Sequence, residues 1–376
     1  MRIVVISASF VPSTAANSIE VMKVANALSD IGHQVTLIVP GEATAKWDEL
    51  SEWYGIRYPF EIIWLKENLA FRRYDFALKA TRKALQLKPD LVYTWMLQAA
   101  VLSLWHRIPV MLELHDRIRG KIAPTLFKSI LHSRIPRLLL PITRALVDVL
   151  ERELSISIPA KLIHIAPSGI ELERYADLPQ AEDTRKLLGL PEGLTAGYSG
   201  HFYSGRGMDL LLSLANSFPG VNFLWVGGQD KAVAEWRQRL HEQGVANVTL
   251  TGFIPNQRIA VYQAACDILL MPYELSIAGS GGGNTADICS PMKMFEYMAA
   301  GRAIMTSDLP VLREVLNEQN AVFCATQDIE AWEMAFGKLI NDPIKRQTLG
   351  EHAIKDVQAY SWNERATKAL AKLGLP

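Results

Sequence analysis

Short apolar segments rich in β-branched residues alternate with amphipathic segments along most of the chain, and this alternation restricts the possible folds most strongly. Within each apolar segment, apolar residues mostly follow one another instead of alternating with polar residues, so each segment predicts a strand buried on both faces. Such strands, separated by helices, form parallel sheets covered by helices on both sides. The predicted strands lie near residues 3–7, 34–39, 61–65, 91–95, 110–114, 138–141 and 162–166, and again near 195–199, 221–226, 248–251, 268–271, 303–306 and 321–324. The sequence therefore predicts an α/β protein with two series of strands.

The two series are separated near residues 167–194, where Pro179, Pro191 and a charged run break the periodicity. A chain of 376 residues is long enough for two domains that each bury a core. We therefore predict two doubly wound domains, residues 1–172 and 173–360, which face each other across a cleft. A final helical segment, residues 361–376, is predicted to return to the first domain. Ligands of such sheets bind beyond the carboxyl ends of the strands.

Composition narrows the function classes. Lysine plus arginine equals aspartate plus glutamate, 39 each, so overall charge does not suggest a nucleic-acid partner. Three cysteines without metal-ligand spacing suit a reducing, cytoplasmic compartment better than a disulfide framework. The longest charge-free apolar stretch, residues 91–105, is too short for a membrane span and fits a strand followed by a buried helix. We therefore expect a cytoplasmic protein, with any membrane contact peripheral.

The segment 290–301, SPMKMFEYMAAG, is the most informative stretch. Ser290 is a good N-cap, and Pro291 suits the first position of a helix. A helix N-terminus presents free N–H groups that suit a phosphate, so Met292 and Lys293 are predicted to bind one, with Lys293 adding a full charge. Glu296 follows in the second turn of a mostly apolar helix. The alternative is that Ser290 caps a core helix and Glu296 is merely solvated.

Two glycine-rich segments accompany this helix. Residues 274–285 contain four glycines within five positions, which permits close backbone approach to a ligand just before the predicted phosphate site. Residues 195–208 run from a strand into a glycine-punctuated turn that could cradle a diphosphate beside Arg206. The alternatives are a flexible surface loop and a tight turn with a solvated arginine. The turn does not have the G-x-G-x-x-G spacing. No such motif follows the first predicted strand of the chain, which argues against a dehydrogenase.

The first domain also has candidate ligand-binding residues beyond the carboxyl ends of its predicted strands. A loop of small residues within 4–18, which contains Asn17, follows the first predicted strand. His115 lies just beyond the strand predicted at 110–114, where a ligand-facing histidine would be found. The alternative interpretation is a structural histidine.

Taken together, these segments resemble retaining glycosyltransferases of family four, which have the GT-B fold of two Rossmann-like domains. The resemblance covers nearly the whole chain in order, and residues 290–301 are its most specific part. It implies that residues 1–172 bind the acceptor and that residues 173–360 bind the nucleotide-sugar. In residues 296–301, EYMAAG, Glu296 takes the position of the family glutamate that holds the ribose hydroxyls.

The resemblance also assigns other residues. Arg206 aligns with the basic residue that neutralises the donor diphosphate, and His115 matches the histidine that faces the donor sugar and the transition state. Residues 251–254, TGFI, look like the segment whose backbone reads the nucleobase. Residues 167–171 resemble the family's hinge segment, and residues 360–362 resemble the start of the returning helix. The residues expected at the nucleotide are Gly252, Phe253, Ile254, Ser290, Met292 and Glu296, and those expected at the donor sugar or in a substrate loop are Asn17, Gly282, Gly283, Asn284 and Thr285.

Two positions depart from the family pattern. Eight positions before Glu296, where the family often has another glutamate, stands Ile288. The contact to the donor sugar is therefore missing or displaced to Asn284, Thr285 or Asp287. His201 stands where an arginine often follows the glycine of the first diphosphate turn.

The resemblance implies transfer of a hexosyl group with retained configuration from a nucleoside-diphosphate sugar, with uridine as the base common in the family. The acceptor would be a saccharide or a lipid-linked saccharide in polysaccharide or glycoconjugate synthesis. His115, Arg206 and Lys293 are the predicted catalytic residues. Because Arg206, Lys293 and the helix start would stabilise the leaving diphosphate, no metal or other cofactor is expected. The alternatives are a catalytically silent nucleotide-sugar-binding partner and a non-hydrolysing sugar-nucleotide epimerase.

One basic segment bears on the acceptor. Residues 117–137 carry Arg117, Arg119, Lys121, Lys128, Arg134 and Arg137 among apolar residues. A basic amphipathic helix of this kind can lie on an anionic membrane, so peripheral contact with the inner face of the membrane is one interpretation. The other is a solvated helix in a domain with more basic than acidic residues.

Overall fold

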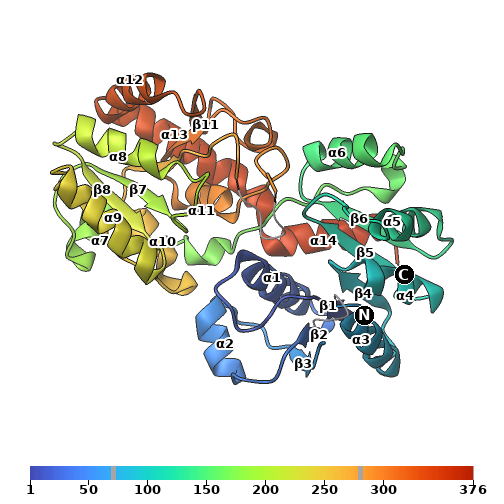
Figure 1. The fold of residues 1–376 in the computed structure, drawn as a ribbon. Coiled ribbons are helices and arrows are strands. Elements are labelled where there is room, and N and C mark those ends of the chain that lie inside the picture. Colours follow the sequence, from blue (N-terminus) through green and yellow to red (C-terminus); the bar gives the residue numbers. More distant parts are fainter. Residues whose placement is uncertain (69–72, 278–282, 376) are drawn as a thin grey trace. The chain divides into compact units, whose positions relative to one another are not determined.

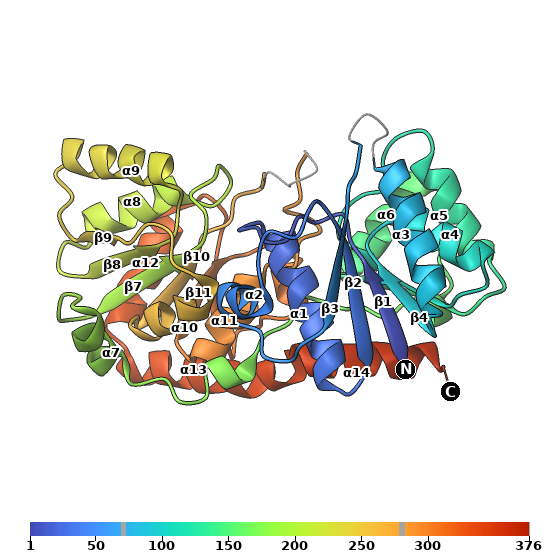
Figure 2. The same ribbon diagram turned by 90° about the horizontal axis from the view of Figure 1, so that it is seen from below.

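The computed structural model describes residues 1–68, 73–277 and 283–375, and the chain divides into two compact units. Unit 1 consists of residues 1–168 together with 362–376, and unit 2 of residues 169–361. Each unit contains a six-stranded parallel sheet (Figures 1 and 2). The prediction of two doubly wound α/β units is confirmed.

The sheet of unit 1 has the strand order β3-β2-β1-β4-β5-β6. Its strands are β1 (Arg2–Ile6), β2 (Gln34–Pro40), β3 (Glu61–Leu65), β4 (Leu91–Thr94), β5 (Val110–Leu114) and β6 (Arg137–Pro141). Its helices are α1 (Ala16–Asp30), α2 (Trp47–Tyr54), α3 (Tyr74–Leu87), α4 (Leu97–Trp105), α5 (Ala123–His132), α6 (Arg144–Leu154) and α14 (Trp362–Leu373). Helix α14 packs beside α1 (Figure 2) and against β6. The C-terminal segment is thus part of unit 1.

Unit 2 repeats the same order in its sheet, β12-β11-β10-β7-β8-β9. Its strands are β7 (Thr195–Ser199), β8 (Asn222–Val226), β9 (Val248–Leu250), β10 (Ile268–Met271), β11 (Ala303–Ser307) and β12 (Ala321–Cys324). Its helices are α7 (Ala181–Leu188), α8 (Met208–Ser217), α9 (Asp230–Glu242), α10 (Asn256–Ala264), α11 (Met292–Ala300), α12 (Ile329–Ile340) and α13 (Pro343–Val357). Trp225 of β8, Trp236 of α9 and Phe336 of α12 share a core with α8 on one face of this sheet.

Local sequence explains several element boundaries. The inner strands are buried along nearly their whole length, as in β5, because helices cover both faces of the sheets, whereas the edge strands β3 and β9 are only half-buried. Helices α6 and α12 have Thr143 and Asp328 as N-caps, whose side chains accept hydrogen bonds from the backbone N–H groups of Leu146 and Ala331. Among the described residues, no helix is both long enough and apolar enough to span a membrane.

One predicted strand is wrong. Residues 160–162 form a short 3-10 helix, and the segment that follows touches β6 at a single bridge between Ile163 and Leu139. Only the N–H groups of His164 and Ala166 donate to β6, and the carbonyls of Ala166 and Pro167 instead accept hydrogen bonds from a side chain of α14. An apolar sequence at the sheet edge therefore became an extended connection rather than a seventh strand.

Two glycines hold the turn after β7 close to the loop after β10. Gly205 and Gly207 both have positive φ, of 86° and 71°. A Cβ on Gly207 would overlap the carbonyl oxygen of Pro272, and one on Gly205 would overlap that of Ser276. Glu274 reinforces the contact, since its N–H donates to the carbonyl of Gly205 (3.1 Å). The close approach of these two loops therefore requires residues without a side chain.

We predict that Gly207→Ala destabilises the protein more than Gly244→Ala does. Gly244 has nearly the same φ, 68°, but no atom lies within 4 Å of the position that a Cβ would take there, so it serves as a matched control. The control should lose about 1 kcal/mol of unfolding free energy from backbone strain alone. Gly207→Ala should lose a further ~1–3 kcal/mol, because the overlap forces the backbone to shift. Urea denaturation measures both; equal losses would contradict the close approach.

Candidate active site

The loops that follow β7, β8 and β9 are joined at the carboxyl edge of the unit 2 sheet. The N–H of Gly200 donates to the carbonyl of Val226 (2.8 Å), and the N–H of Gly227 donates to that of Gly252 (3.0 Å). Gly252, predicted at the nucleotide, is therefore fixed beside the loop after β8. Phe253, which follows it, is 49% exposed, and Ile254 is half-buried. This edge is where open α/β sheets bind ligands.

Lys293, the second residue of α11, directs its ammonium group toward this edge. Its Nζ lies 3.9 Å from the ring centroid of Tyr198 and 5.6 Å from that of Tyr273. The Nζ is buried and has no hydrogen-bond partner among the described residues, although the residue as a whole is half-buried. Burial lowers the pKa of Lys293 well below its usual value, and the nearby Arg206 lowers it further. Such an unpartnered donor group suits an anionic ligand.

Arg206 lies against the same aromatic ring. Its guanidinium carbon is 4.9 Å from the ring centroid of Tyr273, and the adjacent glycines place it in the turn after β7. Tyr273 raises the pKa of Arg206, so the guanidinium stays charged. The structure thus brings Arg206 and Lys293 to one shared tyrosine. His201 stacks on Tyr203 with ring centroids 4.7 Å apart, and burial together with Lys293 and Arg206 lowers the pKa of His201.

Glu296 belongs to a buried hydrogen-bond network rather than being freely solvated. Its Oε2 accepts a hydrogen bond from Nε2 of Gln263 (3.0 Å), which also donates to Oγ of Ser199 at the end of β7 (3.0 Å). Oε1 of Gln263 accepts from the hydroxyl of Tyr175 (2.9 Å). Gln263 therefore links α10, α11 and β7. It is 1% exposed, and its position in a weakly patterned helix gave no sequence signal.

The start of α11 differs from the prediction. The helix begins at Met292, and Pro291 occupies the N-cap position with an extended backbone (φ −74°, ψ 128°). Ser290 therefore precedes the cap instead of forming it, because Pro291 does not adopt helical dihedrals here. The predicted phosphate contacts at Met292 and Lys293 remain in the first turn of the helix, where N–H groups lack partners within the helix.

The predicted substrate loop is partly described. Oδ1 of Asn284 accepts hydrogen bonds from the N–H groups of Ile277 and Ala286 (both 2.9 Å), and Oγ1 of Thr285 donates to the carbonyl of Ile277 (3.2 Å). These side chains therefore shape the loop. Gly283 has a positive φ of 89°, and Gly282 lies outside the described residues. Ile288, where the family often has a glutamate, is fully buried, whereas Asp287 beside it is exposed.

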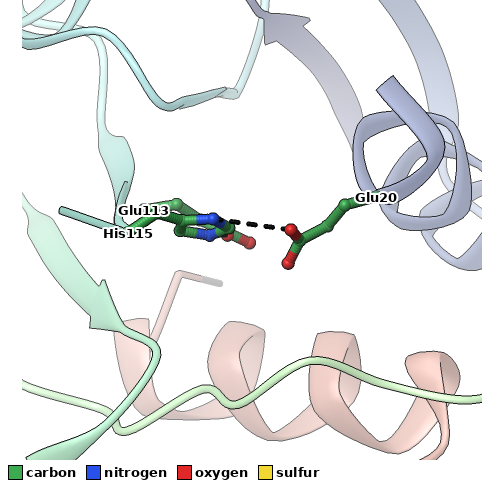
Figure 3. A group of neighbouring side chains, drawn as sticks. All are labelled: Glu20, Glu113 and His115. Atoms are coloured by element: carbon green, nitrogen blue, oxygen red, sulfur yellow. Dashed lines mark hydrogen bonds and ion pairs between the residues drawn. The ribbon is translucent and has the colours of Figure 1, made fainter. Parts of the chain in front are cut away.

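Unit 1 contains a compact polar cluster around His115 (Figure 3). Nε2 of His115 lies 2.5 Å from Oε2 of Glu113, and its Nδ1 lies 3.4 Å from Oε2 of Glu20 on α1. Oε1 of Glu113 pairs with Nη1 of Arg365 on α14 (2.7 Å) and accepts a hydrogen bond from the hydroxyl of Tyr93. Only His115 had been predicted, because most of its partners come from distant stretches of sequence. Asn17, three residues before Glu20 on α1, is exposed.

The charges in this cluster balance when His115 is protonated. Although burial opposes it, Arg365 and His115 lower the pKa of Glu113 to about 2, so this carboxylate is ionised. Burial alone would lower the pKa of His115, but Glu20 and Glu113 together raise it. Burial raises the pKa of Glu20. With Glu113 and Arg365 both charged, Glu20 and His115 are therefore the groups that share the remaining proton.

The same three residues, Glu20, Glu113 and His115, have the spacing of metal ligands. Both Glu113 oxygens are already engaged, one by His115 and the other by Arg365 and Tyr93. A cation at this position would face the guanidinium of Arg365 at short range. The donor set therefore fits a hydrogen-bonded ion-pair cluster better than a metal centre.

The basic segment 117–137 does not form one amphipathic helix. Helix α5 covers only its middle part, and Ile118, Phe127 and Ile130 are buried in unit 1. The apolar side of the segment therefore packs against the protein. The exposed side chains of this segment include Arg119, Lys121, Ile122, Lys128 and Arg134.

Two family models match the chain, one to each unit. A model described as "Glycosyltransferase Family 4" matches residues 21–174, which include His115. A model described as "Glycosyl transferases group 1" matches residues 194–342, which include Arg206, Lys293 and Glu296. The two matches follow the same order as the two sheets.

Curated relatives agree with these matches. Phosphatidyl-myo-inositol mannosyltransferase of Mycolicibacterium smegmatis is 24% identical over 361 residues, which is 91% of this chain and 86% of that protein. A Bacillus subtilis protein named for a glycosyltransferase of teichuronic acid biosynthesis is 27% identical over 166 residues, 43% of this chain and 39% of its own length. The chain spans about half the length of three further curated relatives that it matches.

Solved structures share the fold. The structure of HepE from Anabaena in complex with UDP has a TM-score of 0.74 to this chain and 18% sequence identity, covering 99% of this chain and 100% of that one. With the two family models and the curated relatives, this likeness confirms the resemblance noted in the sequence. The chain belongs to the family-four-like glycosyltransferases, which have the GT-B fold.

Proposed function

We propose that this protein is a retaining glycosyltransferase that moves a hexosyl group from a UDP-sugar to a saccharide or lipid-linked saccharide. The observation that carries the proposal is the buried ammonium of Lys293 beside Arg206 at the carboxyl edge of the unit 2 sheet. This ammonium has no hydrogen-bond partner among the described residues. Two cations directed at the same ring, with no carboxylate bound to Nζ there, suit a diphosphate. A related fold has been solved with UDP bound, in HepE.

In the proposed reaction, the bond between the anomeric carbon and the diphosphate oxygen breaks, and the acceptor hydroxyl oxygen bonds to that carbon on the same face. The hydroxyl proton leaves with the diphosphate. Negative charge therefore grows on the leaving group, and Arg206 and Lys293 stabilise it electrostatically. Because these cations take the place of a metal ion, we propose that transfer requires no metal. His115 is the proposed contact of unit 1 with the donor sugar.

The acceptor is proposed from two curated relatives, one named as a phosphatidyl-myo-inositol mannosyltransferase and one named for teichuronic acid biosynthesis. We propose a saccharide acceptor, and a lipid anchor on it is the narrower proposal. Release of UDP that depends on both donor and acceptor would separate a transferase from a silent nucleotide-sugar-binding partner. If the protein binds UDP but releases none from the donor with any acceptor tested, the catalytically silent binding partner is favoured.

We predict that Glu296→Ala weakens UDP binding by about 2 kcal/mol, the usual loss for a hydrogen bond to a charged group. The fold should survive, because Gln263 keeps its hydrogen bonds to Ser199 and Tyr175. Calorimetric titration with UDP measures the change. Glu330→Ala, at an exposed glutamate on α12, is the control and should bind as the parent does. Equal affinity of the parent and Glu296→Ala would remove Glu296 from the ribose site.

We also predict that UDP binding is accompanied by proton uptake at Lys293. The pKa of Lys293 is depressed in the free protein by burial, and a bound diphosphate would raise it. Affinity should therefore be highest at low pH and fall as pH rises through the pKa of the free lysine. Titrations in the presence of EDTA, carried out in HEPES and in Tris at one pH, measure the uptake, because the buffers have different ionisation enthalpies.

Lys293→Met should abolish this buffer dependence, since methionine fills similar space without a titratable group. Lys293→Arg should bind without uptake, because arginine stays charged at this pH. Identical enthalpies in the two buffers for the parent protein would contradict the predicted proton uptake at Lys293. Loss of UDP binding in EDTA, restored by magnesium or manganese, would contradict the metal-free mechanism.

A further inference from the structure

The buried guanidinium of Arg365 is the centre of the polar cluster in unit 1. Arg365 lies on α14, far from Glu113 in sequence, and its side chain is 6% exposed. Nη1 pairs with Oε1 of Glu113 (2.7 Å) and donates to the hydroxyl of Tyr93 (3.0 Å). Nε and Nη2 donate to the carbonyls of Pro167 (2.8 Å) and Ala166 (3.0 Å). Every nitrogen of the planar guanidinium is therefore used within unit 1.

We infer that Arg365 is a positioning residue for His115, acting through the carboxylate of Glu113. This inference rests on the proposed function, in which His115 contacts the donor sugar, and it extends that function to a residue outside the predicted site. Arg365 itself contacts neither the imidazole nor a substrate group among its observed partners. Its influence on His115 is exerted through the orientation and charge of Glu113.

The geometry explains how the influence is transmitted. One oxygen of Glu113 is held by Arg365 and Tyr93, so the other is fixed toward Nε2 of His115 at 2.5 Å. An ionised carboxylate at that distance requires Nε2 to donate a proton. The indole N–H of Trp95, 3.3 Å from the same nitrogen, then cannot also donate to it. With Nδ1 facing Glu20 at 3.4 Å, the imidazole is fixed at both ring nitrogens.

The charge balance explains why an arginine is needed. Glu20 and Glu113 are both buried, at 6% and 1% exposure, and His115 alone would leave one negative charge without a partner. Arg365 supplies the second positive charge, and arginine cannot lose its proton to escape burial. Without Arg365, the carboxylate of Glu113 would keep only His115 and Tyr93 and could rotate. Removing the partner of a buried charge lowers the stability of the protein, and the side chains around that charge lose their fixed orientation.

Arg365 also connects this cluster to the point where the chain leaves unit 1. The carbonyls that it binds, those of Ala166 and Pro167, directly precede Ser168, the last residue of unit 1 before the chain enters unit 2. Arg365 itself lies three residues after Trp362, where the chain re-enters unit 1. The side chain of Arg365 therefore lies next to both places where the chain passes between the units. The same side chain also contacts Glu113, the partner of the candidate catalytic histidine.

The test follows the imidazole of His115 by NMR in folded protein with labelled histidine, using His115→Ala to assign its signal. The groups that contact the ring are Glu20 on α1, Glu113 on β5 and Trp95 after β4, and Tyr93 on β4 and Arg365 on α14 contact Glu113 behind it. Arg365→Met should raise the pKa of His115, because the carboxylate of Glu113 would then have the imidazolium as its only cationic partner. Glu113→Gln should lower it, because a carboxylate partner is removed. Arg365→Lys keeps the charge and should leave the pKa closer to that of the parent.

A buried arginine in unit 2 provides a matched control. Arg185 pairs with Asp267 (3.0 Å) and donates to the carbonyl of Ala265 (2.8 Å), with 8% of its side chain exposed. Arg185→Met should lower the melting temperature, as Arg365→Met does, but should not move the His115 titration. If Arg365→Met does not fold, Arg365→Gln, which can still donate to the backbone carbonyls, should give the same upward shift.

Kinetics supply the second readout. Arg365→Met should lower kcat by roughly tenfold to a hundredfold while KM for the donor changes little, since the loss concerns orientation at the reacting sugar rather than donor binding. An unchanged His115 titration in folded Arg365→Met or Arg365→Gln and in Glu113→Gln would overturn the inference. If no glycosyl transfer is found at all, the proposed function fails, whereas the opposite titration shifts would still establish the coupling from Arg365 to His115.

Discussion

Burial of both faces of a parallel sheet is the constraint on which the rest of this structure depends. Each unit builds a six-stranded parallel sheet with the same strand order, and helices must return the chain between successive strands. All loops that follow strands therefore emerge at one edge. In unit 2 this edge collects Gly200, Gly227 and Gly252, whose backbones are hydrogen-bonded to the neighbouring loops. Polar groups can gather there because the sheet interior is reserved for apolar side chains.

The two units treat buried charge in different ways. In unit 2, the Nζ of Lys293 is buried over tyrosine rings without a hydrogen-bond partner among the described residues, and Arg206 lies nearby with its charge retained. That arrangement favours an anion. In unit 1, Glu20 and Glu113 meet His115 and Arg365, so positive and negative groups can balance within the protein. One cluster suits ligand binding, and the other suits precise orientation of a single imidazole.

Sequence patterns predicted the elements well where local physics decides them. Strands β3, β5, β7, β10 and β12 have the predicted bounds, and most of them are apolar runs between turn residues, which leave little choice of boundary. The prediction failed at residues 162–166, where side-chain hydrogen bonds from α14 engage the carbonyls at the end of the segment. It also misplaced the cap of α11 by one residue, because the backbone of Pro291 is extended rather than helical. One interpretation of segment 117–137 is a basic amphipathic helix lying on a membrane, but its apolar residues Ile118, Phe127 and Ile130 pack within unit 1.

The sequence by itself determined the α/β class, the two series of strands and the segments that carry His115, Arg206, Lys293 and Glu296, since hydrophobic period and motif are local properties. Only the tertiary structure decided what these residues touch. Gln263 joins Glu296 to β7, Tyr273 lies beside both Arg206 and Lys293, and Arg365 reaches Glu113 from the far end of the chain. Hydrogen bonds and ion pairs form between atoms that are close in space. When the residues are far apart in the sequence, such contacts produce no periodic pattern or motif from which they could be predicted.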